Sequence, residues 1–289
     1  MKKKTRRILI VILLLVFLGS SGMAIRDLLA YRKTDSTNRE LAALMHAAEA
    51  EAEAETEAEP APAGALPAGP DELPEDNQAR VMLPQYRALH DRNPDFAGWL
   101  SSAALGIDLP VMYSEYDQNH YIRSDFDGNY LLGGTLFIGV PWEPVSNHAI
   151  IYGHKMKNGS MFGNLVRYAK EDFGAANPSI SFDTLYRKQT YELFGAFYSK
   201  VYAINDTQAF QYYNYADLSD PEDFDYYVRE VRAAALYDTG VVPEYGDTLL
   251  TLSTCDYYTE NGRFVVVFRQ VDSHTRKTAG STPGADIYK

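Results

Sequence analysis

The sequence predicts a mostly β fold with peripheral helices, either a barrel or a sandwich. After residue 100, short apolar runs rich in β-branched and aromatic residues recur, with Gly, Pro and Asn between them. Hydrophobic residues make up 46% of the 289 residues, with 22 Tyr and 13 Phe, so the chain can build a sizeable core. Six runs are expected to be strands: residues 107–112, 134–140, 148–152, 190–198, 249–252 and 264–271.

The N-terminus has the pattern of a membrane anchor. MKKKTRR precedes an uncharged apolar run over residues 8–25. That run approaches the ~17–25 residues of a bilayer span, and the basic residues before it favour a cytoplasmic N-terminus. A cleaved signal peptide is the alternative, because Ser20, Ser21 and Gly22 offer small residues near a cleavage site. We expect residues 1–25 to be a cytoplasmic tail and a single anchor.

Residues 26–78 are expected to be a juxtamembrane segment followed by a stalk. Residues 26–48 can form a helix. Residues 48–77 form a low-complexity run of Ala, Glu, Pro and Gly in which like charges recur at i,i+4. Such pairs oppose a stable helix, and the segment has no apolar face to bury. The interpretation is a disordered stalk.

The folded domain is expected over residues 79–275, with a C-terminal tail at 276–289. Amphipathic periodicity predicts helices at 80–93, 160–168 and 221–236. Asp220 is a plausible cap for the third helix, with Phe224, Tyr227, Val228 and Val231 on one face. This helix lies within a long connection, residues 206–246, and connections of that length are usually functional. It could instead only cover a flank of the sheet.

Composition excludes some classes of function. The formal net charge is −12, and the basic residues at the N-terminus are followed by an acidic remainder without a basic stripe. This distribution argues against a nucleic-acid partner. One Cys and scattered His residues lack the paired spacing of zinc sites. No metal or cofactor is expected.

Cys255 is the only cysteine and follows the apolar run 249–252. Turn-rich residues come next, and Arg263 then opens the returning run. The thiolate is the reactive form of cysteine, and a nearby cation favours it. Cys255 is therefore a candidate nucleophile. A buried, inert cysteine that acts as a small apolar residue is the alternative.

His154 is the best candidate partner for the thiol. It lies where a predicted strand leaves the sheet. A side chain there can point toward the end of a neighbouring strand, which is also where Cys255 is expected. His148 lies six residues earlier, roughly 20 Å away along an extended strand, and Arg269 is equally remote compared with Arg263. His120 belongs to a polar loop. The remaining histidines lie in the predicted stalk, first helix and tail: His46, His90 and His274.

Such a trio has a definite chemistry. The thiolate attacks a carbonyl carbon, the histidine protonates a leaving amine, and the arginine holds the carbonyl oxygen as negative charge develops on it.

Several motifs together resemble the sortases. TLSTC at 251–255, with Arg263 opening RFVVVFR, resembles the active-site signature of that family. NHAIIYGHKMKNGSMFGNLVRY at 147–168 is similar to the histidine segment in its class B form. NPDFAGWL at 93–100, IDLPVM at 107–112 and HYIRSDFDGNYLLGGTLFI at 120–138 match class B in order and spacing. The resemblance covers about residues 80–272.

The resemblance implies an eight-stranded sortase β-barrel and a membrane-anchored cysteine transpeptidase on the outer surface of a Gram-positive cell. Such enzymes cleave a C-terminal sorting signal of surface proteins through a thioester, which an amine of a cell-wall precursor or a pilin resolves. By motif, Cys255 is the nucleophile, His154 the acid and base, and Arg263 the oxyanion and substrate clamp. By position, further residues are expected to line the substrate groove: Tyr152, Ser253, Thr254 and Ile122.

Two other functions stay open. A cysteine peptidase that releases its acyl group to water uses the same three side chains. The second is a non-catalytic surface module, because a membrane anchor and a stalk are equally consistent with that function.

Overall fold

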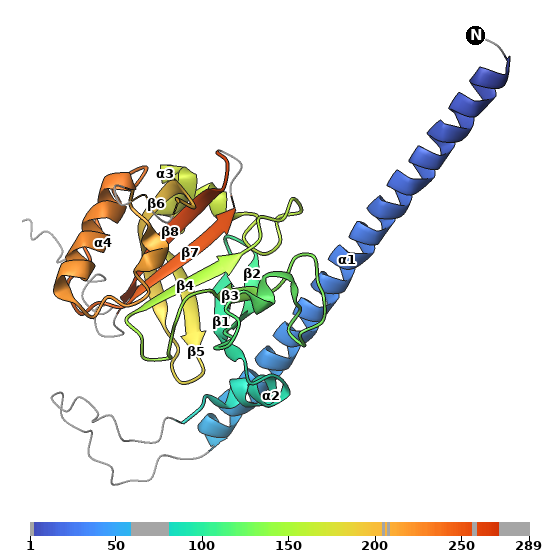
Figure 1. Ribbon diagram of the computed structural model, residues 1–289. Coiled ribbons are helices and arrows are strands. Elements are labelled where there is room, and N and C mark those ends of the chain that lie inside the picture. The colour runs from blue at the N-terminus through green and yellow to red at the C-terminus, as the bar shows by residue number, and fades with distance from the viewer. Residues whose placement is uncertain (1–2, 59–80, 204–205, 207–208, 256–258, 272–289) are drawn as a thin grey trace, which may run out of the picture.

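The computed structural model describes residues 3–58, 81–203, 206, 209–255 and 259–271 (Figure 1). Eight strands form a closed barrel in the order β1-β2-β3-β4-β7-β8-β6-β5. Residues 59–78 of the predicted stalk, His274 and the tail from residue 276 lie outside the described residues. The strands are β1 (Phe96–Ser102), β2 (Ile107–Met112), β3 (Leu136–Ile138), β4 (His148–Gly153), β5 (Ser179–Thr184), β6 (Thr190–Lys200), β7 (Leu249–Cys255) and β8 (Gly262–Val271).

Two of the strand pairs, β2–β3 and β4–β7, are parallel, and the others are antiparallel. A parallel pair needs a long crossover connection. The crossover from β4 to β7 contains β5, β6 and helix α4 (Pro221–Ala234), so this part of the barrel brings together segments far apart in the sequence.

All six predicted strands are present, and the eight-stranded barrel is confirmed. The sequence did not identify β1 or β5, and the alternating pattern of burial in β5 leaves polar residues on its outer side. A helix over residues 160–168 is wrong. Met161 has a φ of 51°, which a right-handed helix does not allow, and only a short 3₁₀ turn, η2 (Leu165–Ala169), follows.

Strands β7 and β8 are among the most deeply buried elements of the barrel core. Residues 264–268 of β8 are all fully buried, although successive side chains of a strand point to opposite faces. Both faces of β8 are therefore covered, one by the barrel interior and the other by outer elements such as η2. Strands with both faces buried are held firmly, and these two strands carry Cys255 and Arg263.

Helix α4 covers one flank of the barrel and packs on β6, away from α1 in Figure 1. Asp220 caps it as the sequence predicted, because its side chain accepts a hydrogen bond from the backbone N–H of Glu222 at 2.8 Å. Phe224, Tyr227 and Val231 are buried and join the main core. This helix therefore has a packing role.

Helix α1 (Lys3–Ala58) differs most from the expectation. It includes residues 49–58 of the predicted stalk, and its second half packs on the folded domain beside α2 (Pro84–Arg92) (Figure 1). Leu41 and Met45 are buried in a cluster with Trp99 and other barrel residues. The prediction of disorder is therefore wrong for residues 49–58, and residues of α1 join the fold ahead of the predicted domain boundary at residue 79.

Two physical effects explain the error. Ala and Glu are both strong helix formers, which outweighs a few tenths of a kcal/mol of repulsion for each pair of like charges. The barrel also supplies partners for the helix. Glu49 lies 2.5 Å from Lys188, and His46 Nε2 lies 2.8 Å from an Asp108 carboxylate oxygen. Tertiary contacts thus stabilise a helix that looks unfavourable when read alone.

The sequence also predicted a membrane span over residues 8–25. Within the described part of the chain, no helix has a stretch long and apolar enough to cross a membrane.

A pair of truncated chains tests the packing of α1. A chain that begins at residue 26 keeps Leu41 and Met45, whereas one that begins at residue 77 lacks them. We expect the shorter chain to have a lower Tm, because burial of each such side chain contributes roughly 1.5–3 kcal/mol. Thermal unfolding followed by circular dichroism measures the difference. Equal Tm values would mean that α1 does not pack on the barrel in solution.

Candidate active site

The ends of β4, β7 and β8 lie side by side. In the parallel pair, Gly153 is level with Thr254, so His154 and Cys255 leave their strands at the same height. In the antiparallel pair, Cys255 lies directly opposite Arg263. Neighbouring strands are about 4.8 Å apart, and side chains at the same level point to the same face. The register thus brings the three predicted catalytic residues to one place.

A single cavity of about 460 Å³ contains all seven residues that the sequence singled out. This volume lies within the range of about 300–1,000 Å³ that is usual for ligand sites. The sequence-predicted residues that line it are Ile122, Tyr152, His154, Ser253, Thr254, Cys255 and Arg263. Cys255 is partly exposed, so it is not the fully buried side chain of the alternative interpretation.

The imidazole of His154 is held by the main chain. Its Nε2 lies 2.8 Å from the carbonyl oxygen of Ile122. Because a carbonyl oxygen only accepts, Nε2 carries the hydrogen and donates it. The other ring nitrogen, Nδ1, is then the one that can exchange a proton with the thiol or a substrate. The sequence predicted Ile122 for the substrate groove, and its backbone has this second role.

Arg263 also has a fixed position. Its Nη1 donates to the carbonyl oxygen of Gly262 at 3.0 Å, at the start of β8. The guanidinium carries its positive charge at any physiological pH. The cavity therefore contains a permanent cation on the strand next to that of Cys255.

The walls of the cavity include residues that the sequence analysis missed. Tyr212 and Tyr213 come from the long connection 206–246, and the Tyr212 hydroxyl lies 2.7 Å from Ser253 Oγ. Burial raises the pKa of Tyr212 to about 12, so this hydroxyl stays protonated. The connection forms a wall of the cavity through these two tyrosines, and no residue of α4 lines it. Other lining residues are Asn119, Phe137, Gly139, Val140, Gly153 and Val201. The cluster of tyrosines in this long connection was the sequence signal that could have identified Tyr212 and Tyr213 as cavity residues.

The histidines and the arginine that the sequence set aside lie elsewhere. His120 is exposed, and His46 lies on α1. Arg269 lies opposite Leu249 at the far end of β7, where it pairs with Glu192 and Asp247. Across the described ranges, no group of three or more His, Cys, Asp or Glu residues is arranged to hold a metal ion.

His148 is fully buried in β4 and belongs to a chain of polar side chains beneath the site. Its Nδ1 lies 2.5 Å from the Tyr215 carbonyl oxygen, and its Nε2 lies 2.9 Å from Thr251 Oγ1. The Tyr227 hydroxyl lies 2.7 Å from the same Oγ1. A neutral imidazole that donates from Nδ1 and accepts at Nε2 satisfies this arrangement. Burial accordingly lowers the pKa of His148 to about 4. These bonds connect β4, β7, α4 and the 206–246 connection.

Comparison with known proteins agrees with this geometry. No protein-family model matches the chain. The sortase B of Listeria monocytogenes is 31% identical over 186 residues, which are 63% of this chain and 72% of that protein. The chain belongs to the sortase B family. The sortase B of Staphylococcus aureus is 26% identical over 191 residues, 65% of this chain and 75% of that protein.

Solved sortase B structures share the fold. The substrate complex of the Staphylococcus aureus enzyme has a TM-score of 0.65 and 20% identity over 85% of this chain and 99% of that chain. A Bacillus anthracis complex has a TM-score of 0.62 and 23% identity over 84% of this chain and 98% of that chain. The resemblance seen in the motifs is thus confirmed. As a sortase, the protein is a cysteine transpeptidase with a sortase fold.

The buried position of His148 predicts a pH dependence of stability in this sortase. The unfolded chain binds a proton near pH 6.5 and the folded chain only near pH 4. The contribution of a neutral His148 is therefore complete above pH 6.5 and is lost as the pH falls toward 4, at about 1.4 kcal/mol per pH unit. Urea unfolding of wild type and His148→Gln between pH 7 and pH 4 measures it. The variant should lack this part of the slope, and identical slopes would contradict it.

Proposed function

We propose that this sortase cleaves the C-terminal sorting signal of surface proteins and transfers the acyl group to an amine of a cell-wall precursor or a pilin. The observation that carries the proposal is that His154, Cys255 and Arg263 line one cavity at the ends of three adjacent strands. A thiol, an acid and base, and a fixed cation are the groups that acyl transfer through a thioester requires.

The three side chains are assigned separate steps. His154 takes the proton of the Cys255 thiol at Nδ1, and the resulting thiolate attacks the carbonyl carbon of the scissile Thr–Gly-type bond. Arg263 stabilises the oxyanion that forms, and His154 gives a proton from Nδ1 to the leaving amine, which produces the thioester. His154 then accepts a proton from the incoming amine as that amine attacks the thioester. The peptide would lie along the wall formed by Tyr152, Ser253, Thr254 and Ile122, all of which line the same cavity.

Substitution of the trio tests these roles. Cys255→Ala and His154→Ala should each abolish thioester formation with a sorting-signal peptide and leave thermal unfolding cooperative. Arg263→Lys should lower kcat/KM about 10²-fold, because an ammonium cannot reproduce the planar fork of a guanidinium. Arg269→Lys, at the other end of the same strand, is the matched control and should stay within about threefold of wild type. Normal turnover by Arg263→Lys would show that its charge alone is sufficient.

The fate of the thioester separates a transpeptidase from a peptidase. Incubation of the enzyme with a sorting-signal peptide, with and without an amine acceptor, should give the ligated product only when the amine is present. Mass spectrometry distinguishes that product from the hydrolysed acid. Hydrolysed acid alone under both conditions would favour the cysteine peptidase. A failure of Cys255 to form any thioester would favour a non-catalytic surface module.

The sortase B relatives support a position at the Gram-positive cell surface. The proposed topology has a single pass, with the N-terminus in the cytoplasm and the barrel outside. It rests on the basic residues of MKKKTRR and the apolar run 8–25 in the sequence. Fractionation of cells that express the chain with and without residues 1–25 tests it. Recovery of both chains in the soluble fraction would refute the anchor.

A further inference from the structure

The support of His154 comes from a loop that also touches helix α1. This loop, residues 119–135, runs from the cavity, where Ile122 accepts the hydrogen bond from His154, to an acidic turn at Asp125 and Asp127. Between these two ends lies η1 (His120–Arg123). Among the described residues, the hydrogen-bond partner of the His154 ring comes from this loop, as the carbonyl oxygen of Ile122.

Hydrogen bonds and close contacts within the 119–135 loop connect its two ends. Asp125 is nearly inaccessible, and its Oδ1 accepts the backbone N–H groups of Asp127 at 3.1 Å and Asn129 at 2.8 Å. The Thr135 N–H donates to the Tyr121 carbonyl oxygen at 3.1 Å. Gly134 packs directly on the backbone of Tyr121 and Ile122. A Cβ at residue 134 would lie 2.5 Å from the carbonyl oxygens of both residues. A shift of the acidic turn would therefore move Ile122.

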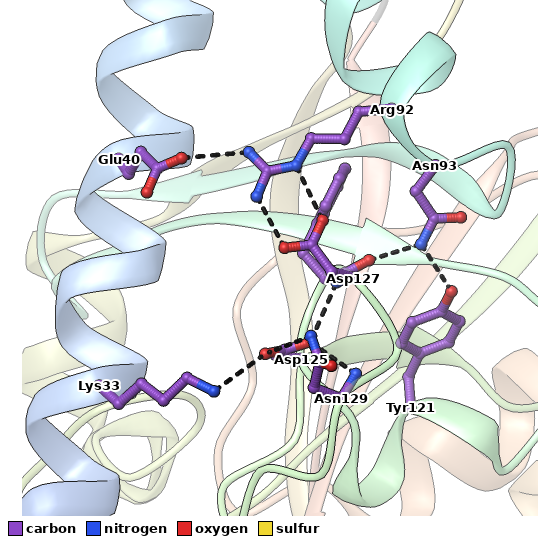
Figure 2. Close-up of polar contacts among 9 residues, drawn as sticks. Lys33, Glu40, Arg92, Asn93, Tyr121, Asp125, Asp127 and Asn129 are labelled. Atoms are coloured by element: carbon purple, nitrogen blue, oxygen red, sulfur yellow. Dashed lines mark hydrogen bonds and ion pairs between the residues drawn. The ribbon is translucent and has the colours of Figure 1, made fainter.

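Arg92, at the end of α2, ties the acidic turn to α1 (Figure 2). Its Nε and Nη2 donate to the two carboxylate oxygens of Asp127 at 2.8 and 2.7 Å, and its Nη1 donates to Glu40 of α1 at 3.2 Å. Figure 2 also shows Lys33 of α1 directed at Asp125, with the two charged groups 3.9 Å apart. The two-point contact with Asp127 fixes direction as well as distance.

The next residue, Asn93, adds a second connection on the side nearer the barrel. Its Nδ2 donates to the Tyr121 hydroxyl at 2.9 Å and to the Phe126 carbonyl oxygen, both in the 119–135 loop. The Tyr121 hydroxyl in turn donates to Asp95 at 3.0 Å. The loop is thus fastened to the junction of α2 and β1, and α1 packs on the outside of that junction through Leu41.

We propose that helix α1 is a positioning element of the active site. Through Glu40, Lys33 and Arg92 it holds the 119–135 loop so that Ile122 keeps its hydrogen bond to His154. The inference rests on the proposed function only for its effect on rate. Undocking of α1 would leave Cys255 and Arg263 in place, because they belong to β7 and β8.

Paired substitutions in the full chain, solubilised in detergent, test the proposal. Leu41→Asp places a charge at a fully buried position of α1, whereas Leu44→Asp changes a residue that is 46% exposed on the same helix. Arg92→Ala removes the connection to the loop, and Arg39→Ala removes an exposed arginine that pairs only within α1 in the contacts described. Leu41→Asp and Arg92→Ala should lower kcat for peptide cleavage about tenfold or more with KM nearly unchanged, and Arg92→Lys should recover part of it. The controls should stay within about twofold.

Two glycines test the loop without a change in α1. Gly134→Ala should lower kcat, because its Cβ would displace the Ile122 carbonyl oxygen. Gly128→Ala has a comparably positive φ in the same loop, but its Cβ would meet only His120 Nε2 at 3.7 Å. It should leave kcat much closer to wild type.

A readout independent of catalysis separates this proposal from the proposed function. In the chain with ¹⁵N-labelled histidine, the imidazole nitrogens of His154, assigned with His154→Gln, should show a hydrogen on Nε2. In Leu41→Asp and Arg92→Ala this signature should give way to a mixture of tautomers. Loss of kcat with loss of the signature supports the proposal. Wild-type kcat or an unchanged signature in an undocked variant overturns it, and so does a fall in kcat that only follows the folded fraction. An inactive wild type with the signature intact would contradict the proposed function alone.

Discussion

The parallel pairing of β4 with β7 is the constraint on which the site depends. It sets Gly153 level with Thr254, and the residues that follow these two in the chain are His154 and Cys255. A shift by one residue would turn one of the two side chains to the opposite face of the sheet, because side chains alternate along a strand. His148 stabilises this register, because its hydrogen bond to Thr251 joins β4 and β7 inside the core.

A parallel pair requires a crossover connection, which here runs over residues 154–248, and the barrel uses that crossover for several purposes. Part of it, β5 and β6, completes the barrel. Helix α4 covers a flank, and the residues before it supply Tyr212 and Tyr213 to the cavity. The Tyr227 hydroxyl of α4 reaches Thr251 in β7, so the crossover also braces the strand that carries Cys255. Groove and scaffold are therefore built from one segment.

The three catalytic candidates are held by different means. Cys255 and Arg263 stand at the ends of strands whose residues are buried on both faces. His154 lies just beyond its strand and depends on a loop carbonyl for its orientation. The histidine is thus the member of the trio most open to influence from outside the barrel, and the acidic turn of the 119–135 loop is where α1 contacts that loop through Arg92.

The sequence by itself determined the fold class and the family, and it predicted the candidate catalytic trio. Apolar runs are local patterns, and they are sufficient to predict most of the strands. The motifs around His154, Cys255 and Arg263 are contiguous stretches of sequence that can be recognised without a structure. Only the tertiary structure decided what depends on partners distant in sequence. The Ala- and Glu-rich helix looked unfavourable because its own charges repel, yet Lys188 and Asp108 of the barrel pair with Glu49 and His46. In the same way, a backbone carbonyl carries no sequence signature, so the role of Ile122 became visible only when the fold brought it to His154.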